Sequence, residues 1–148
     1  MKTLFLLFII PLLSVGQIDK KTNHYVSVGF LDHKTGISML GYTFTIIQNE
    51  NNEIFVGLGT SIATNTLVLG LKKYLFRIFI DGYSVISVQN IYGMGGESFK
   101  SPVVALGFEK KVWRQIFINI GFNSIIRIYP QRSTELINHP YCNLNIRF

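Results

Sequence analysis

Apolar and polar residues alternate one by one along most of the chain after residue 20, without the three-to-four-residue spacing of an amphipathic helix. Successive side chains of a β-strand point to opposite faces, so this pattern predicts strands with one apolar and one more polar face. Turn-forming residues divide the alternation into eight segments, which predicts an all-β protein of eight strands. The segments are 24–31, 37–48, 53–60, 66–74, 76–87, 102–111, 115–129 and 141–148.

The connections between these segments alternate in length in the second half of the chain. Those after the fifth and seventh segments are long, at 88–101 and 130–140, whereas those after the fourth and sixth are short. An up-and-down antiparallel barrel with tight turns on one rim and longer loops on the other gives this alternation. In the first half, the sequence DHKTG at 32–36 predicts a short hairpin turn in which Gly36 adopts a positive φ.

The two faces of the predicted strands differ in kind. The apolar face carries Ile, Leu, Val and Phe in every segment, whereas the other carries mainly Gly, Ser, Thr, Asn and Tyr. A water-exposed face would be rich in Lys and Glu, while a narrow interior suits small polar side chains. A Lys or Arg facing lipid would cost about 2–4 kcal/mol at the bilayer midplane. We therefore predict an eight-stranded antiparallel up-and-down transmembrane β-barrel, with a polar interior filled by its own side chains.

A small set of charged residues falls on the predicted interior face. Its two acids, Asp81 and Glu109, are the only acids expected inside, so we predict at least one carboxylate–guanidinium pair there. Such a cluster is either a gate for ions or a packed, hydrogen-bonded plug that stabilises the barrel, and the plug is the favoured interpretation. The predicted interior charge cluster is Lys72, Arg77, Asp81, Glu109, Arg127 and Arg147, supported by Tyr83, Asn119, Asn143 and Asn145.

The N-terminus has the features of a secretory signal peptide. One Lys precedes an apolar run at 4–13, and small residues occupy the minus-three and minus-one positions before Gln17. An uncleaved membrane anchor is the alternative, but a spanning helix needs about 20 apolar residues and this run has about half as many. We therefore predict a signal peptide at 1–16 and a barrel domain at 17–148.

Composition narrows the classes of protein that fit. Cys142 is the only cysteine, so no intramolecular disulfide stabilises the chain. Charged residues make up 15% of the sequence, below the roughly 25% that is usual for soluble domains. Loss of 1–16 removes one of fourteen Lys and Arg, which leaves a net charge of +5. The cations are scattered, so we expect an attraction to anionic lipid head groups and no binding of nucleic acid.

The chain ends in YCNLNIRF, where alternation continues to a terminal Phe148. This tail resembles the C-terminal signature of bacterial outer-membrane β-barrels, in which a terminal Phe closes the last strand and serves as an assembly signal. With the leader and the eight segments, the chain resembles the small outer-membrane barrels of the OmpA, OmpX and opacity-protein class. The resemblance implies a monomer in the outer membrane, whose partners are membrane lipid, lipopolysaccharide and the barrel assembly machinery. The residues that carry the implied assembly signal are Tyr141, Leu144, Ile146 and Phe148.

The candidate chemistry is sparse. His24, His33 and His139 lack the spacing of metal ligands, so we expect solvated loop residues and neither a metal nor a cofactor. Some barrels of this class act on lipid A through His, Ser and an acid. Ser133 and Glu135 accompany His139 in the second long loop, but no pattern of such an enzyme is present.

Three functions therefore stay open at the level of sequence. The leading hypothesis is a non-catalytic outer-membrane barrel that serves envelope structure, adhesion or surface recognition through its outer loops at 88–101 and 130–140. The first alternative is a lipid A-modifying enzyme in the same fold. The second is a secreted, soluble, lipocalin-like barrel that carries an apolar ligand inside.

Overall fold

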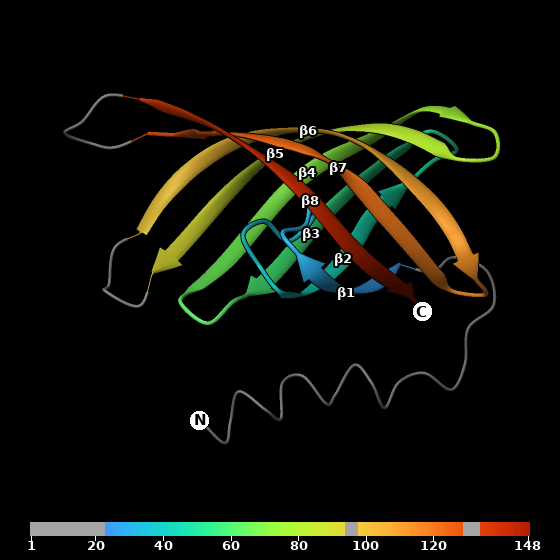
Figure 1. The fold of residues 1–148 in the computed structure, drawn as a ribbon, viewed down its shortest axis with the longest axis horizontal. Coiled ribbons are helices and arrows are strands. Elements are labelled where there is room, and N and C mark those ends of the chain that lie inside the picture. Colours follow the sequence, from blue (N-terminus) through green and yellow to red (C-terminus); the bar gives the residue numbers. More distant parts are fainter. Residues whose placement is uncertain (1–22, 94–97, 129–133) are drawn as a thin grey trace, which may run out of the picture.

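The eight strands form one closed antiparallel barrel in which each strand pairs with its neighbours in sequence (Figure 1). The computed structural model describes residues 23–93, 98–128 and 134–148, so the predicted signal peptide lies outside the described residues. No helix occurs in these ranges. The prediction of an all-β, eight-stranded, up-and-down barrel is confirmed. The strands are β1 His24–Phe30, β2 Leu40–Gln48, β3 Asn52–Thr60, β4 Thr64–Arg77, β5 Asp81–Gly93, β6 Ser98–Trp113, β7 Ile116–Arg127 and β8 Glu135–Arg147.

The first and last strands close the barrel. The ladder between β1 and β8 runs from Tyr25 opposite Arg147 to Phe30 opposite Cys142. Beyond it, the amide of Phe148 donates a hydrogen bond of 3.0 Å to the carbonyl of His24. Backbone pairing therefore continues to the last residue of the chain, and closure leaves β1 with a partner on each side.

Burial alternates along the strands with the period seen in the sequence. On β4, Leu67, Leu69 and Leu71 are exposed, whereas Val68, between the first two, and Lys72, after the third, are completely buried. The faces identified as apolar from the pattern are the exposed faces on most strands.

The fifth segment and the first long loop were predicted wrongly. β4 continues through a bulge between Tyr74 and Phe76 to Arg77, and the chain turns at 78–80. The sequence IFI at this turn has the composition of a strand, which moved the predicted boundary. β5 then continues to Gly93, and β6 already begins at Ser98, so most of 88–101 is strand. Its polar residues are those of the buried strand face, such as Gln89 and Ser101, rather than of a loop.

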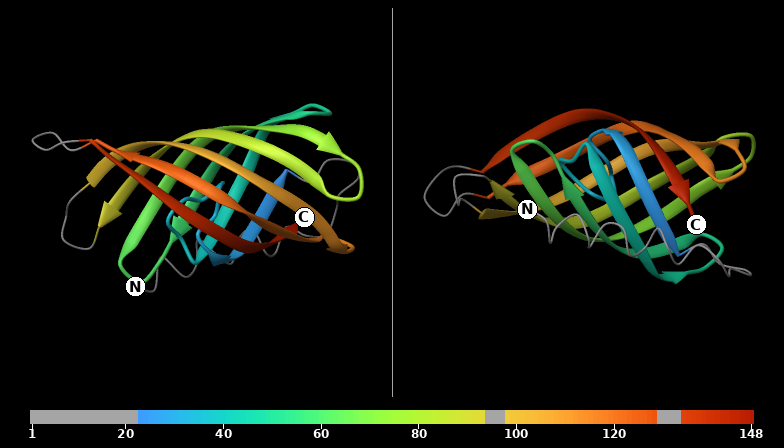
Figure 2. Two further views of the ribbon diagram at one scale, coloured as in Figure 1. Left: turned by 45° about the horizontal axis from the view of Figure 1, so that its top comes forward. Right: turned by 90° about the horizontal axis from the view of Figure 1, so that it is seen from below.

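The second long loop is also shorter than predicted, because β8 begins at Glu135, directly opposite Arg127 of β7. Strands β4 to β8 are longer than β1 to β3. At the end opposite Phe148, β5 to β8 extend past β1 and β2 (Figures 1 and 2). The barrel wall is therefore lower at β1 and β2 than elsewhere at this end. The connection between these two short strands turns into the barrel.

Candidate functional site: an inserted loop and a buried charge cluster

The connection between β1 and β2, residues 31–39, lies among the strands of the barrel (Figure 2). We call it the inserted loop. Asp32, His33, Lys34 and Thr35 are at most 2% exposed. They contact the adjacent strands β3, β4 and β5 and also β8, which lies across the enclosed space from them. The loop therefore occupies the barrel itself, and the expectation that His33 is a solvated loop residue is wrong.

Local hydrogen bonds fold the inserted loop into a small hairpin. The backbones of Asp32 and Gly36 exchange two hydrogen bonds, of 2.9 and 2.8 Å. The Asp32 carboxylate accepts hydrogen bonds from the Lys34 amide and the Thr35 hydroxyl, each of 3.1 Å. Gly36 has a φ of +78°, as the sequence predicted, and Leu31 turns the chain inward with a φ of +58°. The Asp32 carboxylate thus accepts a hydrogen bond from the Lys34 amide, which in a strand would be accepted by the carbonyl of a neighbouring strand.

Glycines on β3 make room for the inserted loop. A Cβ on Gly57 would collide with the carbonyl oxygen of Lys34, and one on Gly59 would collide with that of Thr35. The hydroxyl of Thr66 on β4 donates a hydrogen bond to the same Thr35 carbonyl. The close approach of loop backbone to strand backbone therefore depends on the absence of side chains at these two positions.

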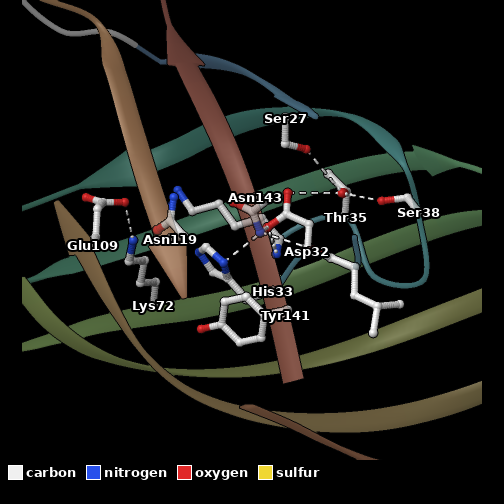
Figure 3. A network of polar contacts seen from close by, with 12 residues as sticks. Ser27, Asp32, His33, Thr35, Ser38, Lys72, Glu109, Asn119, Tyr141 and Asn143 are labelled. Atoms are coloured by element: carbon white, nitrogen blue, oxygen red, sulfur yellow. Dashed lines mark hydrogen bonds and ion pairs between the residues drawn. The ribbon is translucent and has the colours of Figure 1, made fainter. Parts of the chain in front are cut away.

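The loop carries an Asp–His pair into the centre of a hydrogen-bond network (Figure 3). Nδ1 of His33 lies 3.1 Å from the Asp32 carboxylate and 3.3 Å from the Tyr83 hydroxyl. Asn143 of β8 donates to Asp32 at 3.2 Å, and the hydroxyls of Tyr83 and Tyr141 are 2.8 Å apart. Loop, β5 and β8 are thereby joined through hydrogen-bonded polar side chains.

Burial favours the neutral form of the histidine in this pair. It lowers the pKa of His33 below its usual 6.5, and the charges of Lys72 and Lys34 act in the same direction, although Asp32 opposes them. Burial alone would raise the pKa of Asp32, but hydrogen bonding to His33, Ser27 and the Lys34 amide lowers it to about 2. The pair is therefore a neutral imidazole beside a carboxylate.

A second network lies towards the terminal end of the barrel. Lys34 of the loop pairs with Glu53 at 2.5 Å, and Lys72 pairs with Glu109 at 2.9 Å. The Tyr74 hydroxyl lies between the two carboxylates, 2.9 Å from Glu53 and 3.2 Å from Glu109. Arg147 also pairs with Glu109. We call the residues of these two networks that carry charge the buried charge cluster: Asp32, Lys34, Glu53, Lys72, Glu109 and Arg147.

Three carboxylates and three cations make up this cluster, so its formal charges cancel while His33 is neutral. All three cations also face aromatic rings: Lys34 lies 4.0 Å above the Tyr25 ring, Lys72 lies 3.9 Å above the Tyr83 ring, and the guanidinium of Arg147 lies 3.6 Å from the centre of the Phe117 ring. A charge-balanced, hydrogen-bonded arrangement can keep ions buried without leaving an uncompensated charge. Each charged residue of the cluster has at least one ion-pair or hydrogen-bond partner inside the barrel, which favours the interpretation of the cluster as packed and stabilising.

The structure brings together only part of the predicted interior charge cluster. Lys72, Glu109 and Arg147 meet as described. Arg77 does not join them: it is exposed, and its guanidinium lies 3.7 Å from the centre of the Tyr74 ring. Asp81, at the end of β5, is half-buried opposite Arg77, and its predicted place inside is not seen.

Arg127 is half-buried near the other end of the barrel and stays apart from the cluster, with its guanidinium 5.6 Å from the Phe99 ring. The prediction that Asp81 and Glu109 are the only interior acids is wrong, because Asp32 and Glu53 are buried and paired. Glu53 was recognisable, since it has the same parity as Phe55 and Gly57 on the buried face of β3.

The supporting polar residues predicted around the cluster are buried. Asn119 accepts a hydrogen bond of 3.2 Å from Tyr83, and Asn143 holds the loop through Asp32 and the carbonyl of Leu31. Asn145 is buried as well. Of the tail residues, Tyr141 belongs to the hydrogen-bond network, Leu144 is exposed, and Ile146 and Phe148 are half-buried along the seam.

The histidines and the loop residues considered for metal binding or catalysis are spread over β1, the inserted loop and β8, or lie outside the described residues. His24 and His139 are half-buried on β1 and β8, and Glu135 is exposed, while Ser133 lies outside the described residues. Within the described ranges, no group of three or more His, Cys, Asp or Glu is placed to hold a metal ion.

Comparisons of the chain with protein-family models, curated proteins and solved structures give no match. In the part of the chain that the structure describes, no helix is long and apolar enough to cross a membrane. Any functional inference therefore rests on how this chain arranges its own residues.

Proposed function

We propose that the protein is a small, non-catalytic β-barrel of the outer membrane, with a role in envelope structure, adhesion or surface recognition. The observation that carries the proposal is the exposed side of the sheet. Large apolar residues are exposed on every strand, at positions that alternate with buried ones. A soluble protein would bury such a continuous surface, whereas lipid chains cover it at no cost.

The height of this apolar surface fits a bilayer. On the exposed face of β6, the apolar or half-buried positions 102–108 lie between Lys100 and Lys110, ten residues apart. At about 3.4 Å per residue and a tilt of about 35–45°, these two lysines are separated by roughly 24–28 Å along the barrel axis. Outer-membrane barrels carry an apolar band about 25 Å tall. On β4, Asn65 and Lys73 bound the three exposed leucines in the same way.

The proposed interior is polar and filled. Buried residues include the charge cluster and many Ser, Thr and Asn side chains, and the inserted loop occupies space that a channel would need. This weighs against transport of solutes, and against the soluble, lipocalin-like alternative, which requires an apolar lining around its ligand. The role we propose is therefore structural, or recognition by the hairpins opposite the termini.

Membrane partition tests the proposal directly. The full chain, expressed in a diderm bacterial host, is expected in the outer-membrane fraction after alkaline extraction, with a mobility in electrophoresis that changes on boiling. Leu106→Arg places a charge near the middle of the band and is expected to cost about 2–4 kcal/mol of insertion, which depletes the inserted form. Asn90→Arg, near the edge of the band, is the matched control. A chain that stays soluble without detergent contradicts the proposal.

A further inference from the structure

The end of the barrel near the termini carries an unusual concentration of exposed cations. They lie on the hairpin that joins β4 to β5 and on the one that joins β6 to β7. We call these residues the cationic rim: Lys73, Arg77, Lys110, Lys111 and Arg114.

Few acids lie near these cations: Glu50, exposed in the β2–β3 turn beside the end of β4, and Asp81. In the described ranges, no ion pair joins any of the five to an acid. Glu109, the nearest acid along β6, is already held by Lys72 and Arg147. Asp81 is half-buried opposite Arg77 and is the only other acid on these two hairpins. The rim therefore presents a net positive charge to its surroundings.

Apolar side chains project between the cations. Ile78 is 88% exposed and Phe79 is 77% exposed at the β4–β5 turn, and Trp113 is 66% exposed at the end of β6. The ammonium group of Lys110 lies 4.0 Å from the centre of the Phe79 ring, which joins the two hairpins. Aromatic and apolar tips beside unpaired cations suit an amphiphile, whose anionic group meets the cations while its chains meet the rings.

The opposite rim also exposes apolar side chains, such as Ile62 and Leu136, but it carries fewer cations. Among the residues that the structure describes there, Lys100 is exposed and Arg127 is half-buried. Arg127 also stands directly opposite Glu135 in the β7–β8 ladder. The positive charge is thus concentrated at one end of the barrel. Lys100, at the other end, provides a matched control for the cationic rim.

We propose that the cationic rim is a binding site for the phosphodiester head group of an anionic phospholipid, with Ile78, Phe79 and Trp113 placed among its glycerol and acyl groups. The inference rests on the proposed membrane location. A lipid is favoured over a soluble phosphate because the cations alone would serve a soluble anion, and the exposed apolar tips would then contact only water. An acidic protein partner offers no counterpart for tips that sit at the boundary of the apolar band.

The single tryptophan of the chain makes the site directly observable, because Trp113 stands within it. The protein purified from membranes is reconstituted in bilayers of phosphatidylcholine that contain a small, fixed share of brominated lipid. Brominated phosphatidylglycerol is expected to quench Trp113 fluorescence several-fold more strongly than brominated phosphatidylcholine at the same share. Added salt should reduce the difference, while soluble glycerophosphate should compete no better than salt of equal ionic strength.

Variants separate charge from fold. Lys110→Gln/Lys111→Gln/Arg114→Gln retains Trp113 and is expected to abolish the preference for phosphatidylglycerol, so that both brominated lipids quench equally, because each lost cation weakens the attraction about fivefold. Lys100→Gln, on the same strand at the other rim, should leave the preference unchanged. Ile78→Ser/Phe79→Ser should weaken quenching by both lipids without changing their ratio. Boiling-dependent mobility checks that each variant is folded.

The outcomes distinguish the two proposals. Equal quenching by both lipids in the wild type, or an unchanged preference in the triple variant, overturns the lipid site and leaves the membrane proposal standing. Competition by glycerophosphate assigns the rim to a soluble phosphate and overturns the lipid site as well. A protein that gives no quenching with either lipid and stays in solution overturns both.

Discussion

Connections between strands are usually polar and exposed, and two connections of this barrel depart from that rule in different ways. The inserted loop is highly polar, and its Asp32, His33 and Lys34 are almost completely buried. The β4–β5 turn at 78–80 is entirely apolar, and it is the more exposed of the two. The difference shows that a polar side chain is buried here where hydrogen-bond or ion-pair partners surround it. Polar groups are enclosed where other polar groups meet them, and apolar groups point out, where only an apolar or interfacial environment would accommodate them.

The largest effect is expected from removing a partner of the buried loop. Glu53→Leu leaves the ammonium group of Lys34 buried without its carboxylate, which we expect to lower the free energy of unfolding by about 3–5 kcal/mol. Urea titration of the protein in detergent or lipid measures the change. Glu50→Leu, an exposed neighbour in the β2–β3 turn, serves as the control with little effect.

The double variant Lys34→Met/Glu53→Leu sharpens the comparison. It removes both charges together and is expected to recover most of the stability, because neither ion is left alone. A double variant as unstable as Glu53→Leu would show that the ion pair does not explain how the loop is held.

A smaller effect is expected from filling the space beside the loop. Gly57→Val places a side chain where the Lys34 carbonyl lies, so we expect the loop to be displaced, at a cost of about 1–3 kcal/mol from overpacking. Faster proteolysis within 31–39 should accompany the loss of stability. Ala63→Val, in the exposed β3–β4 turn, changes volume without touching the loop. Equal proteolysis of both variants would contradict the placement of the loop against β3.

Acid should weaken the loop in a defined direction. The folded pKa of His33 lies below 6.5, so the unfolded chain binds a proton first, and stability falls as the pH decreases below about 6.5. Asp32 adds to this only in stronger acid, since its contribution is present above 3.8 and lost as the pH falls through about 2. The slope due to His33 is at most about 1.4 kcal/mol per pH unit. Thermal midpoints measured from pH 8 downward should therefore fall in the wild type, and His33→Gln should flatten the profile near pH 6.

The smallest effect is expected at the apolar turn. Phe79→Ser removes a ring that contacts only Lys110 among charged groups, so the free energy of unfolding in detergent should change by less than about 0.5 kcal/mol. A loss comparable with that of Glu53→Leu would mean that the turn is packed within the protein, and the contrast between the two connections would disappear.

The number of strands and their two faces could be predicted from the sequence, whereas several strand boundaries and the path of the connections could not. Period-two alternation identifies the exposed leucines of β4 and the isoleucines of β7, because each strand reports its own two faces. It fails at 78–80, where the turn has the composition of a strand, and at 88–93, where polar residues such as Gln89 belong to the buried face. Composition alone does not distinguish an apolar turn from the end of an apolar strand.

The burial of the inserted loop could not be predicted from periodicity, for a different reason. Periodicity says nothing about the path of a connection, and the partners of the loop come from distant parts of the chain. Lys34 meets Glu53 across 19 positions, and Lys72 meets Glu109 across 37. The available signal was Gly57 and Gly59 on one strand face, which indicates a close backbone approach but does not identify the approaching segment.

The contact between Asn143 and Leu31 has a consequence for how the barrel folds. This hydrogen bond spans 112 positions, nearly the whole described chain, and it joins the segment after the first strand to the final strand. Contacts so far apart in sequence form slowly, because a long stretch of chain must be ordered before they are made. We therefore expect the seam and the Asn143 contacts of the loop to form late, and a nascent chain that lacks β8 has neither.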